Sequence, residues 1–557
     1  MIADITITEK SFGAKPLMTG VSLSIDDGEK VGVVGRNGIG KSTLFGILAG
    51  TDKDFSGSVI YRRGVVVVAT QQEHHDVGDQ TVLQYVLHGL PEYTGLSHII
   101  ETYPETMGDN LRKIGQYTEA LQRFDDLGYY QVEEHIECEL DNFQLPGVAH
   151  RSLQSLSGGQ KRLVEVVKVM HSSAHLALVD EPTNHMDYVA KEQFIDWLKD
   201  AREAVLVITH DRDVLHEVDR IVELKDGYAV SYSGNYDAYL RQNATSTSTR
   251  MHEYEVVQRQ IENVKNKIVQ FRRLKEKARD PDTIKQFKRR ENAAVAELAT
   301  LEKVERPSFW IDKQSASQLD HKQNERYEKY KAKNIRLNGL AQTASRSKRV
   351  LVKATDIALG YHAAEPADTK ALFRNVSFEL RENEIVELRG RNGAGKTTLI
   401  KALLARAKGV TPETLLAGEL EMDPHASIGI YEQEISSTYL PLSLSSAIEQ
   451  LYLDRKQSIG REKVMQLMGD YLFDPILDAS VPLTQLSGGQ KARFQLIAML
   501  ASNPQLLILD EPTNHLDLPS IEEMENALKK YAGAILYVSH DGYFRKALGG
   551  TVVELGA

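Results

Sequence analysis

The strongest constraint on the fold of this chain is an internal repeat of short motifs. The segment LSGGQKR (Leu156–Arg162) recurs as LSGGQKAR (Leu486–Arg493). VDEPTNHMD, which ends at Asp187, recurs as LDEPTNHLD, which ends at Asp517. Both pairs lie 330 residues apart. Because the motifs keep their order and spacing, they indicate a duplicated domain.

The glycine-rich segments GRNGIGKST (Gly35–Thr43) and GRNGAGKTT (Gly390–Thr398) form another pair, 355 residues apart. The first copy is therefore longer between this segment and LSGGQ, and most of the excess follows Gln72. The inserted residues resemble a short helical elaboration of the first copy.

Each copy has the pattern of an α/β domain. A short apolar run precedes each glycine-rich segment (Lys30–Val34 and Glu384–Arg389), and another precedes each Asp-Glu pair (Leu176–Val179 and Leu506–Leu509). Such runs alone do not separate a strand from a buried helix, but the bracketing glycines and acids favour parallel strands. We therefore predict two α/β domains in one chain.

The glycine-rich segments match the P-loop pattern GxxxxGK[ST], between a predicted strand and a predicted helix. Glycines let backbone N–H groups point at phosphate oxygens, and the following helix N-terminus favours negative charge. Lys41 and Lys396 should reach the β- and γ-phosphates, and Ser42 and Thr397 should offer a hydroxyl to Mg²⁺. The predicted binding residues are Gly35, Arg36, Asn37, Gly38, Ile39, Gly40, Lys41, Ser42 and Thr43, and in the second copy Gly390, Arg391, Asn392, Gly393, Ala394, Gly395, Lys396, Thr397 and Thr398.

Two acidic residues follow each of the later apolar runs. Asp180 and Asp510 end these runs, where a carboxylate can bind Mg²⁺ directly or through water. Glu181 and Glu511 come next and are predicted to polarise a water molecule for in-line attack on the γ-phosphate. The alternative is a surface Asp-Glu pair, but the hydrophobic approach places the acids at strand ends, where α/β sheets bind ligands.

A histidine follows a further apolar run in each copy. His210 comes after Val205–Ile208 and His540 after Ile535–Val538, each 30 residues beyond the aspartate predicted to bind the metal ion. Such a histidine can hydrogen-bond the γ-phosphate and hold the attacking water. Most isolated histidines are merely solvated or satisfied in a core, so this prediction depends on the repeat.

Together the P-loop, LSGGQ, DEPTNH and the later histidine resemble the ATP-binding cassette superfamily, in both halves of the chain. In that superfamily two cassettes meet head to tail, and the LSGGQ signature of one covers the ATP held by the P-loop of the other. The resemblance implies that the second signature covers ATP at Lys41, that the first covers ATP at Lys396, and that both sites hydrolyse ATP with Mg²⁺. The implied signature residues are Ser157, Gly158, Gly159 and Gln160, and Ser487, Gly488, Gly489 and Gln490, while Gln72 and Gln433 resemble Q-loop glutamines.

Between the copies, apolar residues recur at spacings of three and four from Tyr254 to Leu274, and a second pattern runs from Ile284 to Leu301. This spacing is typical of a helical seam. Because Asp280-Pro281 separates the two patterns, we predict an antiparallel helical hairpin with a short turn. The expected domains are residues 1–240, a hairpin linker at 241–346, and residues 347–557.

The hairpin concentrates positive charge in an acidic chain. The whole sequence has a net charge of −11, whereas residues 241–350 hold 26 Lys and Arg against 14 Asp and Glu. Basic side chains near the tip can neutralise phosphates without reading bases, although a solvated coiled coil with a basic bias explains the composition almost equally well. The candidate RNA contacts are Arg272, Arg273, Lys275, Lys277, Lys285, Lys288, Arg289 and Arg290.

Twin cassettes, DEPTNH in both, GNYDAYL (Gly234–Leu240) and a charged hairpin resemble the ABC-F family. The resemblance implies a translation factor or antibiotic-resistance protein that binds the ribosomal E site, with its hairpin directed toward rRNA and P-site tRNA. Met186 replaces the usual leucine of the motif NHLD, which removes no reactive group. General translation and antibiotic protection both stay open.

The main alternative is the ATPase component of a membrane exporter with a separate transmembrane subunit, in which a long basic hairpin has no evident role. The chain has one cysteine, Cys138, which we expect to be a small buried hydrophobic residue. One cysteine excludes the zinc modules of excision-repair relatives and the iron–sulfur domain of ribosome-recycling relatives, so no DNA partner is expected. Without an apolar run of about 18 residues or a signal-peptide pattern, we expect a cytoplasmic monomer with intramolecular cassette pairing.

Overall fold

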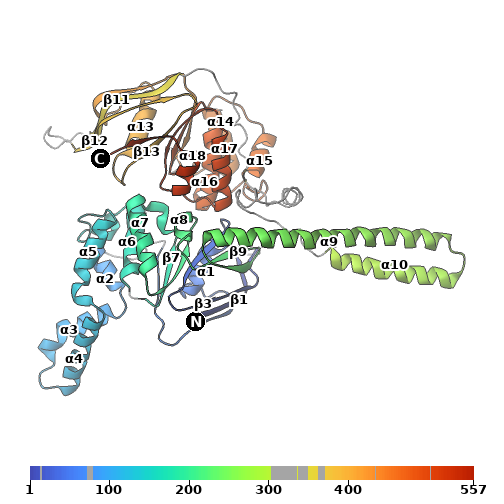
Figure 1. Cartoon of the computed structure of the whole chain (residues 1–557), viewed down its shortest axis with the longest axis horizontal. Helices are drawn as coiled ribbons and strands as arrows, with labels where there is room; N and C mark the ends of the chain where they lie inside the picture. Colours follow the sequence, from blue (N-terminus) through green and yellow to red (C-terminus); the bar gives the residue numbers. More distant parts are fainter. Residues whose placement is uncertain are drawn as a thin grey trace. The chain divides into compact units, whose positions relative to one another are not determined.

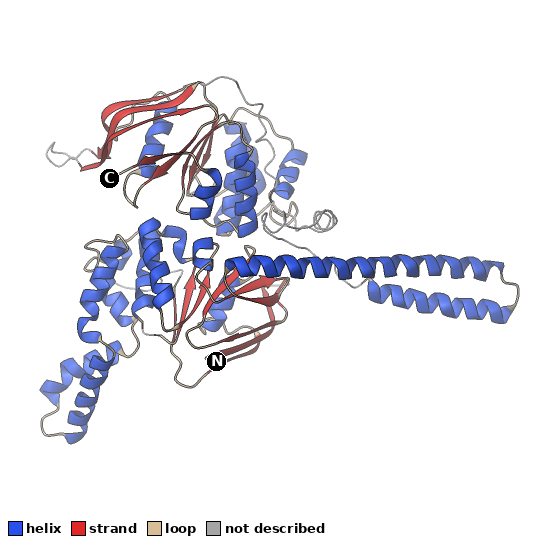
Figure 2. Ribbon diagram, in the orientation of Figure 1, coloured by secondary structure: helices blue, strands red, loops and turns tan. Residues whose placement is uncertain are grey.

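The computed structural model of the 557-residue chain describes residues 1–12, 15–71, 79–172, 174–302, 335, 349–361, 370–432, 435–501 and 504–556 (Figures 1 and 2). The chain divides into two compact units. The first unit, Met1–Tyr236 with Ile335–Ala557, contains both copies of the repeat, and the second unit, Asp237–Asn334, contains the hairpin. Gln72 and Gln433, the predicted Q-loop glutamines, lie outside the described residues.

The first copy is built on a six-stranded sheet in the order β10-β9-β4-β8-β7-β6. Its strands pair in parallel except for the β9–β10 pair, which is antiparallel. The strands of this sheet are β4 (Lys30–Gly35), β6 (Val67–Ala69), β7 (Leu176–Asp180), β8 (Ala204–Ile208), β9 (Arg220–Lys225) and β10 (Tyr228–Ser233). A second, antiparallel sheet contains β1 (Ala3–Phe12), β2 (Lys15–Met18), β3 (Val21–Ile25) and β5 (Ser56–Tyr61).

The second copy repeats this design. Its parallel sheet has the order β15-β16-β17-β13-β18, and its antiparallel sheet has the order β12-β11-β14. The parallel strands are β13 (Ile385–Arg389), β15 (Ile428–Tyr431), β16 (Leu506–Asp510), β17 (Ala534–Val538) and β18 (Thr551–Glu554). The antiparallel strands are β11 (Val350–Tyr361), β12 (Lys370–Arg381) and β14 (Leu415–Met422).

The central strands are apolar along their whole length because elements cover both faces of a parallel sheet. All five residues of β8 and all five of β17 are buried. The strands predicted before the P-loops and the Asp-Glu pairs are confirmed as β4, β13, β7 and β16. Since β8 lies between β4 and β7, the carboxyl ends of these strands meet at one edge and bring the predicted site residues together.

Helices connect these strands, and within the described ranges the first copy has more of them. The P-loop and signature helices are α1 (Lys41–Leu48) and α6 (Gly158–His171), with α13 (Lys396–Ala407) and α16 (Gly488–Leu500) in the second copy. The later helices are α7 (Tyr188–Asp200) and α8 (Arg212–Leu215), with α17 (Leu518–Lys529) and α18 (Gly542–Leu548). Short 3-10 helices lie at Tyr129–Gln131, Leu153–Ser155, Pro182–His185 and Leu483–Gln485.

The expected helical elaboration of the first copy is confirmed. It forms α2 (Val82–His88), α3 (Tyr93–Thr106), α4 (Leu111–Asp126) and α5 (Val132–Asn142), where the described part of the second copy has α14 (Leu444–Asp454) and α15 (Arg461–Asp470). The expectation that Cys138 is buried is wrong, because this thiol is exposed. It lies on α5, where Val132, Ile136 and Leu140 supply the buried face.

The second unit is the predicted hairpin of two helices, α9 (Tyr236–Lys277) and α10 (Pro281–Leu301). Three residues separate the helices, and the Asp280 carboxylate accepts hydrogen bonds from the Thr283 backbone N–H and hydroxyl. Val264, Ile268 and Ala294 form the buried core between the helices. Because α9 begins at Tyr236, the expected boundary at residue 240 falls inside a helix. None of the helices in the described ranges combines the length and apolar character that crossing a bilayer requires.

Candidate active site

Each P-loop turns directly into a helix through a glycine in the left-handed region. Gly40 has φ 105° and Gly395 has φ 93°, and neither helix N-terminus receives a side-chain cap. The first backbone N–H groups of α1 and α13 can therefore bind an anion. The lysine ammonium groups lie across their loops: Lys41 Nζ donates to the carbonyl oxygen of Gly35 at 2.7 Å, and Lys396 Nζ donates to that of Gly390 at 2.7 Å.

A hydroxyl and a carboxylate meet beside the second P-loop. Thr397 Oγ1 donates to Asp510 Oδ2 at 2.9 Å, and burial raises the pKa of Asp510 to about 6. These are hard oxygen ligands of the kind that Mg²⁺ prefers, so the residues fit the predicted cofactor. Ser42 and Asp180 hold the corresponding places in the first copy, at the start of α1 and the end of β7.

The two predicted catalytic glutamates share a strained backbone. Glu181 has φ 46° and Glu511 has φ 49°, a region that non-glycine residues rarely adopt. Neighbouring strands hold each glutamate in this conformation. The Glu181 N–H donates to the carbonyl oxygen of Ile208 at 2.8 Å, and the Glu511 N–H donates to the carbonyl oxygen of Val538 at 3.0 Å. The same strain at both equivalent positions indicates that the turn sets the direction of the carboxylate.

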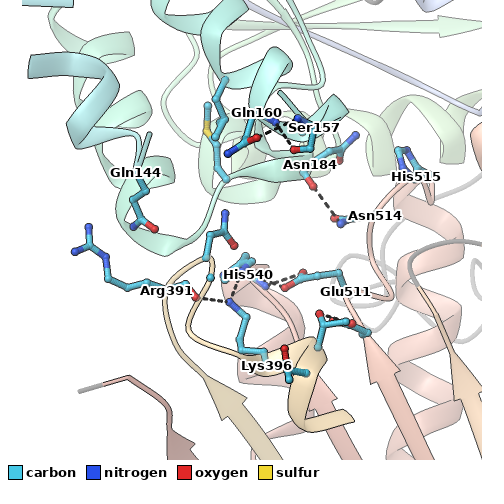
Figure 3. Close-up of a pocket in the computed structure, with 18 of the residues that line it drawn as sticks. Gln144, Ser157, Gln160, Asn184, Arg391, Lys396, Glu511, Asn514, His515 and His540 are labelled. Carbon is cyan, nitrogen blue, oxygen red and sulfur yellow. Dashed lines mark hydrogen bonds and ion pairs between the residues drawn. The ribbon is translucent and has the colours of Figure 1, made fainter. Parts of the chain in front are cut away.

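Each glutamate lies beside the predicted histidine and lysine of its own copy. His540 Nε2 is 3.2 Å from Glu511 Oε1 and 3.4 Å from Lys396 Nζ. Figure 3 draws His540 between these two residues. In the first copy, His210 Nε2 is 3.6 Å from Glu181 Oε1 and 3.0 Å from Lys41 Nζ. The structure therefore brings the candidate lysine, glutamate and histidine of each copy close together.

Burial sets the protonation of these groups. It raises the pKa of Glu181 to about 8 and that of Glu511 to about 7, although Lys41 and Lys396 oppose the shift. Burial, with help from Lys396, lowers the pKa of His540 to about 3, and burial likewise lowers that of His210. The histidines are therefore neutral near pH 7, and the glutamates have the near-neutral pKa that suits a general base.

The two copies contact each other head to tail. The backbone N–H of Asn392, in the second P-loop, donates to Asp187 Oδ2 of the first copy at 2.9 Å. The reciprocal contact joins the Asn37 N–H of the first P-loop to Asp517 Oδ2 at 3.4 Å. Between these two contacts, Asn514 donates through its side-chain amide to the carbonyl oxygen of Asn184 at 3.1 Å.

The head-to-tail contact creates a shared cavity of 1070 Å³ around Lys396. Ser157 and Gln160 of the first signature line it opposite Lys396, Glu511 and His540 of the second copy, as Figure 3 shows. Tyr361, a residue that is 57% exposed, also lines this cavity. Its hydroxyl oxygen lies 3.5 Å from Thr398 Oγ1. An exposed aromatic ring beside a phosphate-binding loop can stack on a nucleotide base.

At the other P-loop the facing signature lies in direct contact. An ideal Cβ on Gly489 would come within 2.2 Å of Asn37 Nδ2, so the Asn37 side chain lies against the signature backbone. The same amide donates to the carbonyl oxygen of His515 at 2.7 Å. The second signature therefore also meets the first P-loop, in direct contact instead of across a cavity as at Lys396.

The signature serine and glutamine have a structural task besides any ligand contact. Ser157 Oγ accepts from the Gln160 N–H, and Gln160 Oε1 accepts from the Ser157 N–H; Ser487 and Gln490 repeat this capping box. The reciprocal bonds fix the start of α6 and α16, so these helix N-termini keep a constant direction.

Sequence reasoning assigned no role to Asp187 or Asp517. Each caps a helix with one carboxylate oxygen: Asp187 Oδ1 accepts from Ala190 N–H at 3.0 Å and Asp517 Oδ1 from Ser520 N–H at 3.1 Å. The other oxygen reaches the opposite P-loop. The recurrence of an N-cap residue directly before a helix in both copies was the signal that could have identified them.

The candidate RNA contacts lie at the tip of the hairpin unit, and seven of the eight side chains are exposed there, Lys275 being half-buried. Two of the eight already have an acidic partner. Arg272 Nε lies 2.8 Å and Lys275 Nζ 2.5 Å from the carboxylate of Glu291, whose pKa these hydrogen bonds lower. Glu291 interrupts the apolar seam, and the two basic residues satisfy its charge.

Comparison with known proteins agrees with this geometry. The family model described as ABC transporter matches residues 18–184 and 373–514, and a related model with the same description matches residues 222–318. The chain is 29% identical to the energy-dependent translational throttle protein EttA of Mycobacterium tuberculosis, over 96% of this chain and 88% of that protein. It is 27% identical to the ribosome protection protein VmlR of Bacillus subtilis, over 97% of this chain and 84% of that protein. It is 28% identical to the ATP-binding protein Uup of Escherichia coli, over 96% of this chain and 77% of that protein.

Solved structures share the fold at lower identity. The structure titled RNase-L Inhibitor has a TM-score of 0.56 at 18% identity and covers 99% of this chain and 87% of that chain. The two matched ranges of the family model include both P-loops and both signatures. The chain therefore belongs to the ABC transporter ATP-binding superfamily and, within it, to the ABC-F family of twin-cassette proteins.

Proposed function

We propose that this protein hydrolyses ATP at both cassette sites and uses nucleotide-dependent closure of the cassettes to act on the ribosome. In this proposal residues 1–240 and 347–557 are the cassettes, and residues 241–346 are the linker that contacts rRNA and P-site tRNA from the ribosomal E site. The observation that carries the proposal is the reciprocal contact of Asp187 with Asn392 and of Asp517 with Asn37. Such a contact couples each P-loop to the other cassette.

The proposed reaction is attack of water on the γ-phosphorus of ATP, with cleavage of the bond to the bridging oxygen so that ADP leaves. Glu511 accepts a proton from the attacking water, and neutral His540 can hydrogen-bond both the water and the γ-phosphate. Lys396 and the N-terminus of α13 stabilise the developing negative charge. Thr397 and Asp510 would hold Mg²⁺, which neutralises phosphate charge when bound. Glu181, His210, Lys41, Ser42 and Asp180 have the same roles in the first cassette.

The ribosome part of the proposal is supported by the relatives and by the charge of the hairpin. The printed names of EttA and VmlR describe a translational throttle and a ribosome protection protein. The exposed basic side chains at the tip of α9 and α10 provide the positive charge that a phosphate backbone attracts without base readout.

The test is ribosome cosedimentation of the Glu181→Gln/Glu511→Gln double variant. Removing both general bases should stop hydrolysis and hold the cassettes closed on ATP, because the closed state retains contacts that the open state lacks. We expect this variant to sediment with ribosomes when ATP is present. Adding Lys41→Ala and Lys396→Ala should abolish both ATP binding and cosedimentation.

A matched control replaces two exposed glutamates with glutamine outside the site, Glu9→Gln and Glu419→Gln, and should leave ATP turnover and sedimentation as in the unmodified protein. Recovery of the hydrolysis-deficient variant with membranes, and none with ribosomes, would contradict the proposal and favour the exporter ATPase. Full ATP turnover by the double variant would contradict the assignment of the two glutamates.

A further inference from the structure

Lys191 is a buried lysine that the reaction as described does not use. It lies in the first turn of α7, four residues after Asp187, and only 6% of the residue is exposed. A cation in the first turn of a helix is electrostatically unfavourable, and burial of an ammonium group is costly without partners. The position therefore needs an explanation from its surroundings.

All three N–H donors of Lys191 have acceptors in the structure. Nζ lies 3.1 Å from Asp211 Oδ2 and 2.6 Å from Asp213 Oδ2, both in its own cassette. The third acceptor is the backbone carbonyl oxygen of His540 in the other cassette, at 3.0 Å. Burial alone would lower the pKa of Lys191, but the two carboxylates outweigh it and keep the pKa above its ordinary value. The side chain is therefore a charged bridge between cassettes.

The first cassette also contacts the backbone just after His540. An ideal Cβ on Gly542 would lie 2.9 Å from Asp213 Oδ2, so the Asp213 carboxylate packs against the Gly542 backbone. Arg212, next to Asp213, forms a buried ion pair of 3.1 Å with Glu525 on α17. The first cassette thus contacts the segment that carries His540 at His540 and at Gly542, and contacts α17 at Glu525.

The segment that carries His210 is held differently: Arg212 pairs with Glu525 and the Tyr543 hydroxyl hydrogen-bonds His216, but among the described residues no side chain of the second cassette donates to the His210 carbonyl oxygen. Applying the 330-residue repeat, Lys191 corresponds to Ile521 and Asp213 corresponds to Tyr543. Ile521 is buried and lines a small cavity with His210, so an apolar side chain stands in the region where the second cassette could support that histidine. The two composite sites therefore differ in how their histidines are held.

We propose that Lys191 is a positioning residue for His540, which fixes the backbone of this histidine from the opposite cassette and makes hydrolysis at the Lys396 site depend on Lys191 more than hydrolysis at the Lys41 site does. The inference rests on the proposed ATP hydrolysis. Lys191 does not line the cavity around Lys396, so it acts on the rate through His540 and leaves ATP affinity to the P-loop. Full hydrolysis at the Lys396 site then requires α7 of the first cassette to contact the second cassette.

The experiment measures each site separately. Glu181→Gln leaves only the Lys396 site with its glutamate, and Glu511→Gln leaves only the Lys41 site. In each parent, Lys191→Met is compared with Lys191→Arg, which keeps the cation, and with Lys199→Met. Lys199 lies on the same helix, is 46% exposed, and forms a surface ion pair with Glu217, so its loss should change nothing.

We expect Lys191→Met to lower kcat at the Lys396 site about tenfold with KM for ATP within about twofold, because misplacement of a catalytic group affects the reacting state and not ground-state binding. At the Lys41 site the loss should stay below about threefold, and Lys191→Arg should recover part of the rate at Lys396. Equal losses at both sites, or a change confined to KM, would overturn the inference.

Removing Lys191 leaves Asp211 and Asp213 without their cation, and the single variant can fail to fold. In that case the double variant Lys191→Met/Asp213→Asn, which removes one charge of each sign, replaces the single variant. The expected loss is again larger at the Lys396 site than at the Lys41 site. Activity at the Lys41 site, measured with the same two substitutions in the Glu511→Gln parent, reports folding. Absence of hydrolysis in the unmodified protein and in both parents would overturn the proposed reaction itself, whereas unselective losses overturn the inference alone.

Discussion

Asp187 accepts a hydrogen bond from the backbone N–H of Asn392 at 2.9 Å, although 205 residues separate them in the sequence. Asp187 is fully buried and uses its other carboxylate oxygen to cap α7. One side chain thereby ties the start of a helix in the first cassette to the P-loop of the second. Through this hydrogen bond, a movement of the first cassette can change the position of the phosphate-binding loop of the second.

The first prediction separates the two tasks of Asp187. Asp187→Ser should keep the helix cap, because serine is a good N-cap residue, but one hydroxyl cannot also reach Asn392. We expect ATP turnover in the Glu181→Gln parent to fall on the order of tenfold, because a buried hydrogen bond that positions the P-loop is lost. Turnover is measured by phosphate release.

The melting temperature of the Asp187→Ser variant should stay within a few degrees of the parent, which separates lost coupling from lost folding. The reciprocal variant Asp517→Ser in the Glu511→Gln parent should repeat the effect at the Lys41 site. Unchanged turnover in both variants would show that the cross-cassette hydrogen bonds do not matter for hydrolysis.

The second prediction concerns the contact between Gly489 and Asn37. In Gly489→Ala the new Cβ would lie 2.2 Å from Asn37 Nδ2 and 2.9 Å from Asn37 Cβ, so the Asn37 side chain must move away. The displacement breaks the 2.7 Å hydrogen bond to the carbonyl oxygen of His515. We expect turnover in the Glu511→Gln parent to drop several-fold, about 1 kcal/mol in the barrier.

Gly469→Ala is the matched control for this substitution. Gly469 lies on α15, and no atom lies within 4 Å of an ideal Cβ there. Alanine should be tolerated at this position and even stabilise the helix slightly. If Gly469→Ala and Gly489→Ala reduced turnover equally, the contact with Asn37 would not be the cause.

The third prediction concerns the tip of the hairpin. Reversing two exposed charges, Arg289→Glu with Arg290→Glu, should weaken ribosome binding and reduce the slope of log K against log salt by about two, one for each lost phosphate contact. Basal ATP turnover without ribosomes should not change. Binding is measured by cosedimentation across a series of salt concentrations.

Lys265→Glu is the control on the same hairpin. Lys265 lies on α9 outside the basic tip and pairs with Glu302 at 2.9 Å. Its reversal should leave the salt slope nearly unchanged. A slope that the double variant leaves unaltered would mean that Arg289 and Arg290 never meet phosphate.

The fourth prediction is a pH dependence of stability that comes from His171. Burial lowers the pKa of this histidine to about 4, and within the part of the chain that the structure describes its buried Nε2 has no hydrogen-bond partner. The unfolded chain binds a proton near pH 6.5 and the folded chain only near pH 4, so the contribution to stability is full above pH 6.5 and falls as the pH drops to 4. At pH 5 the loss is at most about 2 kcal/mol.

His171→Gln should therefore lessen the drop in the free energy of unfolding between pH 7.5 and pH 5, as measured by urea denaturation at the two pH values. Replacing an exposed histidine, His98→Gln, provides the comparison. If both variants kept the acid sensitivity of the unmodified protein, His171 would not be its source.

The strands and the P-loops of this protein, and the places of the candidate catalytic residues at the strand ends, could be predicted from the order of residues alone. These features are local: a buried strand, a glycine turn and a helix start occupy consecutive residues, so the order of residue types fixes their geometry. Glu181 and Glu511 follow directly after β7 and β16, and their positions follow from the positions of those strands. The helical hairpin was readable for the same reason, because its apolar spacing is a local pattern.

Which residues meet across the two cassettes is set by the packing of the folded chain. The contacts of Asp187 with Asn392 and of Lys191 with His540 join segments more than 200 residues apart, and no local pattern encodes them. Packing also placed Cys138 in solvent and paired Glu291 with Arg272. Such contacts depend on how the helices and strands pack against one another. This packing gives the two nearly identical sets of motifs different contacts around His210 and His540.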